Sequence, residues 1–214
     1  MRKLFFFLLL STLFASCFLF SRVGYYDVTL YEVDKPKDSN ERYGESKIIT
    51  FAENNKTRYS YEDEIIKITW TILLSTEFAF VLENKSDHSI KIIWDDAVYV
   101  DVRGQSGRVM HKGVKYTDKN QVQPASVILK KSTLSDLIVP TDNVYFEGGK
   151  YGRGWVSNPL FPNQAETKKE LLYLTQKYIG KTVKILLPLQ IQGTVNEYIF
   201  SFTIDDFTIM KKDF

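Results

Sequence analysis

Apolar and polar side chains alternate along much of the chain, with the period of two that is typical of β-strands. The clearest case lies in residues 181–209, where every second residue from Tyr198 to Ile204 is apolar. This pattern predicts a hairpin that turns around Gly193 and Asn196. Pro188 lies inside its first arm. It predicts an edge strand or a bulge there, because a central strand needs the amide hydrogen that proline lacks.

Similar patterns predict further strands within residues 25–33, 47–51, 64–84, 90–102, 108–116 and 125–140. Residues 64–84 are long enough for a helix, but their Ile, Thr, Trp and Phe content and the alternation of Phe78, Phe80 and Leu82 favour two β segments or one long bent strand. Residues 34–46 are polar without an apolar period, which predicts a loop.

One helix interrupts the strands. Leu171, Leu174 and Tyr178 are three and four residues apart, and Gly180 provides a stop signal, so a short helix is predicted at about 163–179. Short strands without alternating helices predict an all-β fold, an immunoglobulin-like two-sheet β-sandwich, in a single domain over residues 25–214.

The N-terminal 16 residues have a short basic start, an apolar run and small residues before Cys17. This layout is that of a secretory signal. The stretch "LFASC" resembles the lipobox of bacterial lipoproteins, which implies that Cys17 is lipidated and becomes the new N-terminus, with residues 17–24 as a tether. The alternative is an uncleaved signal anchor, because Phe18, Leu19 and Phe20 prolong the apolar run to about the length that spans a bilayer.

Cys17 is the only cysteine. With lipid on it, the mature chain has no thiol for a disulfide, a zinc site or a nucleophile. By resemblance to enteric lipoproteins, an aspartate after the lipidated cysteine would retain the protein in the inner membrane. Phe18 stands there instead, which implies the outer membrane of a bacterial cell envelope and leaves the periplasmic or surface face open.

The segment 80–140 carries a second pattern. It contains an Asn-Lys-Ser turn, a Trp-Asp strand, a Gly-Gln-Ser turn, the stretch "VMHKGVKY" and a closing "IVP". This order resembles a group of secreted bacterial lipoproteins of unknown function. The resemblance implies a β-sandwich envelope protein without an assigned activity.

The charge balance argues against nucleic acid as a partner. The whole chain has 28 basic and 26 acidic side chains. Loss of Arg2 and Lys3 with the signal leaves 26 of each, a formal net charge of zero. Nucleic-acid binding begins with neutralisation of phosphates by a basic face, and no cluster of Lys and Arg provides one.

Catalytic and metal-binding patterns are weak. His111 lies near Ser106 and Asp101 in sequence, but a triad is defined by geometry and no nucleophile-elbow context is present. The adjacent pairs Asp95–Asp96 and Asp205–Asp206 fall in predicted strands, where neighbours point to opposite faces. We therefore assign no catalytic residue, no metal ligand and no cofactor.

The best candidate for a binding surface is residues 145–161, a glycine-rich segment that lacks the context of a phosphate-binding loop. Long loops rich in aromatic residues often bind partners. The candidate residues are Tyr145, Phe146, Tyr151, Arg153, Trp155 and Phe161. The alternative is that Trp155 and Phe161 fold back over an open end of the sandwich, whereas Trp70 and Trp94 are predicted to lie in strands within the core.

Two classes of function follow. The first is a membrane-anchored, non-catalytic envelope lipoprotein that binds a glycan or a protein partner or assembles with another subunit. The second is an envelope hydrolase whose active site the sequence does not reveal.

Overall fold

The structure is a computed structural model that describes residues 22–53, 56–73, 76–149 and 152–210. The predicted signal peptide 1–16, Cys17 and most of the predicted tether 17–24 lie outside the described residues. The last three residues of that tether, Arg22 to Gly24, already belong to the first strand.

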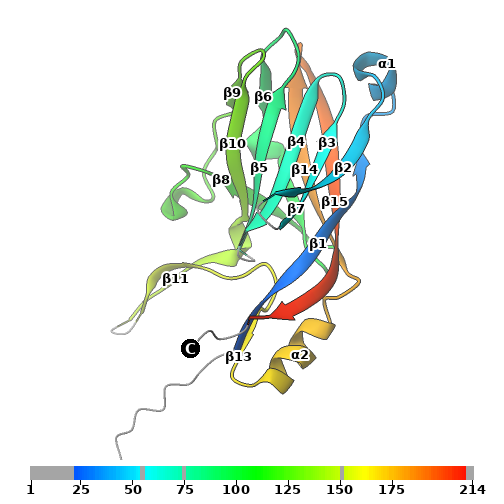
Figure 1. Cartoon of the computed structure of the whole chain (residues 1–214). Coiled ribbons are helices and arrows are strands. Elements are labelled where there is room, and N and C mark those ends of the chain that lie inside the picture. The colour runs from blue at the N-terminus through cyan, green and yellow to red at the C-terminus, as the bar shows by residue number, and fades with distance from the viewer. Residues whose placement is uncertain (1–21, 54–55, 74–75, 150–151, 211–214) are drawn as a thin grey trace, which may run out of the picture.

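The all-β prediction is confirmed: one large, curled antiparallel sheet folds into two layers (Figure 1). The first layer consists of β13 (Gln164–Ala165), β1 (Arg22–Asp34), β15 (Thr194–Ile209), β14 (Thr182–Ile191), β6 (Ile90–Ile92), β7 (Val98–Val100) and β9 (Ser126–Ile128). The second consists of β10 (Thr133–Pro140), β5 (Glu77–Asn84), β4 (Ile66–Leu73), β3 (Lys56–Glu62) and β2 (Lys47–Glu53). β8 (Ser106–His111) pairs with β7 and with β10 and so joins the layers.

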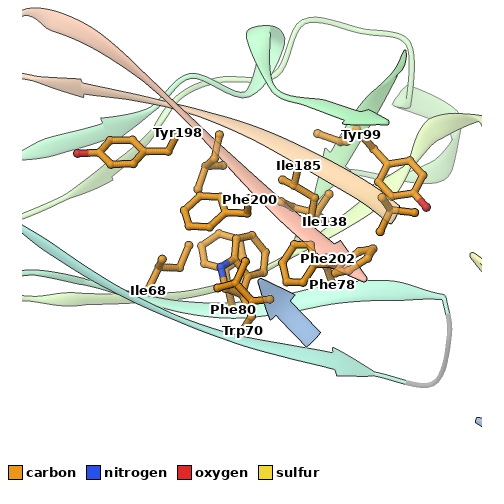
Figure 2. Close-up of a cluster of buried hydrophobic side chains, with 14 of the residues drawn as sticks. Ile68, Trp70, Phe78, Phe80, Tyr99, Ile138, Ile185, Tyr198, Phe200 and Phe202 are labelled. Atoms are coloured by element: carbon orange, nitrogen blue, oxygen red, sulfur yellow. The ribbon is translucent and has the colours of Figure 1, made fainter. Parts of the chain in front are cut away.

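The core lies between these two layers and is rich in aromatic rings (Figure 2). The ring of Trp70 in β4 lies 4.9 Å from that of Phe200 and 5.4 Å from that of Phe202, both in β15. Side chains of the two layers therefore interdigitate, as in a β-sandwich. The alternation predicted in β5 and in β15 is confirmed, because every apolar residue that it names is buried.

β14 and β15 form the predicted hairpin, but β14 is not an edge strand. Pro188 is buried in the middle of β14 and lies opposite Glu197 of β15. On its other side the neighbouring chain is interrupted between β6 and β7 by the 3-10 turn Trp94–Asp96. Pro188 therefore needs no amide hydrogen for that neighbour, and its carbonyl oxygen accepts a hydrogen bond from the Ile93 amide.

The same 3-10 turn changes two other expectations. Trp94 is buried as predicted, but it lies in the turn and not in a strand. Asp95 and Asp96 also belong to this turn.

The predicted helix at 163–179 is shorter in the structure, where α2 spans Lys168–Gln176. Its start is delayed because β13 pairs with β1 and because the Thr167 hydroxyl caps the helix by accepting from the Glu170 amide. Leu171 is buried, and Leu174 and Tyr178 pack against the core as predicted. A second helix, α1 (Ser39–Tyr43), lies in the predicted loop 34–46. Neither helix is long and apolar enough to span a bilayer, and the described part of the chain contains no other α-helix.

Candidate binding surface on the β11–β12 hairpin

Residues 144–157, predicted as an irregular loop, form a two-stranded hairpin of β11 (Val144–Glu147) and β12 (Gly154–Ser157). Among the described strands it is the one pair that is not part of the large sheet. In Figure 1 the hairpin extends away from the sandwich, toward the end of the molecule where β1 begins. A two-stranded hairpin in water is marginally stable unless another element supports it.

Three aromatic rings gather on one side of this hairpin. Phe146 lies directly opposite Trp155, and their ring centroids are 5.7 Å apart at 66°. Tyr116, from the 3-10 turn Tyr116–Asp118, contacts Trp155 at 6.3 Å and 61°. Phe146 is 62% exposed and Trp155 is 39% exposed. We call Tyr116, Phe146 and Trp155 the aromatic face.

The base of the hairpin is fixed to the body. Val144 is fully buried in a small second core with Met110 and Val139. The Asn158 amide donates to the Asn143 carbonyl at 2.8 Å. The ammonium of Lys119 donates to the carbonyl oxygens of Thr141 and Val144. A rigid base thus holds the exposed rings in a defined position.

The other predicted surface residues occupy different positions. Tyr145 is 37% exposed and points to the opposite side of the hairpin from Phe146, because neighbours on a strand alternate. Arg153 forms an ion pair with Glu147 at 2.7 Å. The hydrogen bond from Arg153 to Glu147 raises the pKa of the guanidinium. Tyr151 lies outside the described residues.

Phe161 lies in the main core and not on the aromatic face. It is 1% exposed, and its ring lies 5.3 Å from that of Tyr26 and 6.2 Å from that of Tyr178. The alternative in which Trp155 and Phe161 both fold back over the sandwich therefore describes Phe161 alone. The position of Phe161 indicates that it covers the end of the core near Tyr26 and Tyr178.

His111 occupies a separate, mostly buried position at the end of β8. Its Nδ1 lies 3.2 Å from Oδ2 of Asp136, and its ring stacks on Trp94 at 4.3 Å with planes 1° apart. Oδ1 of Asp136 accepts from the amides of Lys112 and Leu137. Asp101 instead binds Arg103, so the structure does not bring His111, Ser106 and Asp101 together. Within the described ranges, no group of three or more His, Cys, Asp or Glu side chains is arranged to hold a metal ion.

The aromatic face contains one residue that sequence reasoning missed. Tyr116 belongs to the stretch "VMHKGVKY" and reaches Trp155 only because the turn after β8 lies beside the hairpin. Its aromatic type was the only available signal. Its contact with Trp155 depends on the fold.

Comparisons of this chain with protein-family models, with curated proteins and with solved structures find no match.

Proposed function

We propose that this protein is a membrane-anchored, non-catalytic envelope lipoprotein that binds a partner through the aromatic face of the β11–β12 hairpin. The proposal combines the lipobox-like stretch that ends at Cys17 with the exposed rings of the hairpin. The partner is a protein or a glycan, and the ring geometry favours a protein.

The observation that carries the proposal is the exposure of Phe146 and Trp155 on a hairpin outside the large sheet. Leaving large aromatic side chains in water has no benefit for the folded monomer. Trp and Tyr, however, dominate binding energy at protein interfaces, where a partner removes them from water. The ordered base at Val144 limits the freedom that the hairpin must lose on binding.

The angles between the rings distinguish the two partner classes. The Trp155 ring meets Phe146 at 66° and Tyr116 at 61°. These rings therefore form a ridge of edges and faces, which suits a protein pocket better than the flat stacking surface that a sugar ring requires.

The position of β1 agrees with an anchor at Cys17. Four residues lie between Cys17 and Arg22, where β1 begins, and five fully extended residue steps span about 17 Å. A lipid on Cys17 would hold the end of the molecule at which β1 begins close to the bilayer. The hairpin extends toward the same end (Figure 1), so it would reach partners near the membrane surface.

Photo-crosslinking in intact cells tests the binding surface. A photoreactive amino acid replaces Phe146, and the control replaces Tyr173 of α2, which is equally exposed at 63%. We expect a discrete adduct from position 146, absent from position 173, that decreases when Trp155→Ala is added. A glycosidase-sensitive adduct would indicate a glycan. Equal adducts from both positions, or no effect of Trp155→Ala, would contradict the proposal.

Detergent partitioning tests the anchor independently. We expect the native protein to enter the detergent phase and Cys17→Ala to become soluble or remain unprocessed. If Cys17→Ala partitions like the native protein after normal processing, the lipid anchor is wrong, and the binding surface can still be tested as above.

A second candidate, an envelope hydrolase, rests on the His111–Asp136 pair. Such a pair orients a general base in many hydrolases. Labelling of the envelope with broad activity-based probes, with His111→Gln as the control, tests it. Labelling of the native protein that His111→Gln abolishes would favour the hydrolase over the binding module.

A further inference from the structure

β2 is the last strand of the large sheet in the second layer. Among the described strands it pairs only with β3, so the outer edge of its backbone has no strand partner. Its side chains are also open to solvent, with Ile48 37% exposed and Phe51 36% exposed. An open edge of this kind is a template for pairing with another strand.

Natural proteins usually protect such edges with a proline, a bulge or a central lysine. β2 contains no proline, and its pairing with β3 continues without a register shift from Lys47 to Glu53. Its five central residues are uncharged, and its two charges stand at opposite ends. The usual protection against edge pairing is therefore missing.

The sequence of β2, Lys-Ile-Ile-Thr-Phe-Ala-Glu, is complementary to itself when two copies run antiparallel. With Thr50 on a two-fold axis, Lys47 of one copy lies opposite Glu53 of the other, and Ile49 lies opposite Phe51. Lys47, Ile49, Phe51 and Glu53 share one face of the strand, because side chains alternate. The pairing thus places opposite charges together and apolar side chains together on that face.

Another register loses this match. Moving the axis to Ile49 places Lys47 opposite Phe51 and brings Glu45 opposite Glu53. Like charges directly opposite one another destabilise strand pairs. The charge pattern therefore favours the axis at Thr50 over the axis at Ile49.

We infer that β2 pairs with β2 of a second copy of this chain, in antiparallel orientation about Thr50, and forms one continuous sheet across a two-fold dimer. A two-fold axis makes the contact close on itself, which limits the assembly to two copies. This inference goes beyond the proposed function and does not depend on the hairpin or on the lipid.

A seven-residue edge contact is smaller than the usual stable protein interface, so the dimer is weak in solution. Confinement of the chains on one surface would increase their effective concentration and favour the dimer. The test therefore uses a covalent trap, which detects weak and transient pairing.

Disulfide trapping uses the full chain with Cys17→Ser, which removes the only native cysteine. Thr50→Cys brings two thiols to the axis, where directly opposed Cβ atoms are about 5 Å apart. Thr57→Cys is the control. Thr57 is also exposed but lies on β3, the strand paired with β2, so the two copies of Thr57 in the dimer are more than about 14 Å apart. We expect a disulfide-linked dimer to form at least about tenfold faster with Thr50→Cys. Equal rates would overturn the inference.

Charge reversal then tests the register. In the Thr50→Cys background, Lys47→Glu alone and Glu53→Lys alone each place like charges at both ends of the contact, and we expect each to slow trapping at least about fivefold. A mixture of these two variants restores opposite charges at both ends, so the mixed dimer should form at about the parental rate. Unchanged trapping by either single variant, or no recovery in the mixture, would contradict this pairing. Circular dichroism confirms that each variant is folded.

Discussion

Aromatic rings meet in similar ways in two regions of this molecule, the core between the layers and the β11–β12 hairpin. Trp70 and Phe200 lie 4.9 Å apart at 60° and are almost completely buried. Phe146 and Trp155 lie 5.7 Å apart at 66° and remain 62% and 39% exposed. The geometry of the ring contact is thus nearly the same in both regions. The core rings are covered by a second layer of strands, and the hairpin rings are not.

This difference separates stability from recognition. A ring buried by a second layer loses its contact with water on folding and stabilises the native state. A ring on an uncovered hairpin loses its contact with water only when a partner covers it, so its burial stabilises the complex. The following predictions measure how far the two regions differ in this respect.

The largest predicted effect is a loss of folding stability at high pH, and it arises from tyrosines of the core. Burial raises the pKa of Tyr26, Tyr61, Tyr99 and Tyr198 well above 10. The unfolded chain releases these protons near pH 10, whereas the folded chain retains them, so stability is full below pH 10 and falls as the pH rises further. Each tyrosine then lowers the free energy of unfolding by about 1.4 kcal/mol per pH unit. The four together lower it enough to unfold the protein within one or two pH units. Circular dichroism and tyrosinate absorbance should change together. Ionisation of the four buried tyrosines with an intact fold would contradict the prediction.

Truncation of one ring in the core comes next. Trp70→Ala should lower the free energy of unfolding by about 3–5 kcal/mol, because it leaves a cavity between the layers. Trp70→Phe is the matched control. It also removes the indole N–H, which is buried and has no hydrogen-bond partner among the described residues, so we expect a loss of less than about 1.5 kcal/mol. Chemical denaturation of both variants measures the difference, and equal losses would mean that a phenyl ring restores none of the packing that the indole provides.

The polar edge of the aromatic core gives a smaller effect. Asp63 is buried, accepts from the amides of Ile65 and Ile66, and lies within hydrogen-bond distance of the hydroxyls of Tyr61 and Tyr198. Asp63→Ala removes these acceptors and should cost about 2–3 kcal/mol. Asp63→Asn retains one acceptor oxygen and should cost less in the same denaturation experiment. Equal losses would show that the carboxylate charge, which both variants remove, matters more than the hydrogen bonds.

The smallest effect on stability is expected in the hairpin. Trp155→Ala should change the free energy of unfolding by less than about 1 kcal/mol, since no second layer covers this ring. The same variant should remove the exposed component of tryptophan fluorescence, because Trp70 and Trp94 are buried. A loss as large as that of Trp70→Ala would mean that the hairpin belongs to the stabilising core and would remove the contrast between the regions.

Sequence patterns predicted the core well and the hairpin poorly, for a physical reason. Burial of one face imposes a period of two, and this period was visible at Phe78, Phe80 and Leu82, all of which are buried. β3 has a partly polar sequence and was missed, although Tyr61 is 1% exposed. Its fully buried residues Ser60 and Tyr61 are neighbours and only one of them is apolar, so β3 shows no period of two.

The hairpin was recognised from its aromatic composition but not from its pairing. The opposition of Phe146 and Trp155 depends on the register of β11 against β12 across a long glycine-rich turn. A turn of that length does not fix a register in sequence, whereas a two-residue turn does. Pro188 shows the same limit, because its tolerance depends on the interruption of a neighbour that is distant in sequence.

The pairing of β1 with β15 has a consequence for the order of folding. β1 is the first described strand and β15 the last, and Gly24 lies opposite Ile209. A ribosome makes β1 long before its main partner exists, so the first layer can close only after β15 has been made. Contacts between such distant segments form slowly, and the unpaired strand is meanwhile exposed to aggregation. The first layer must therefore form after β15 has been synthesised, and a shortened chain without β15 would leave the buried side chains of β1 uncovered.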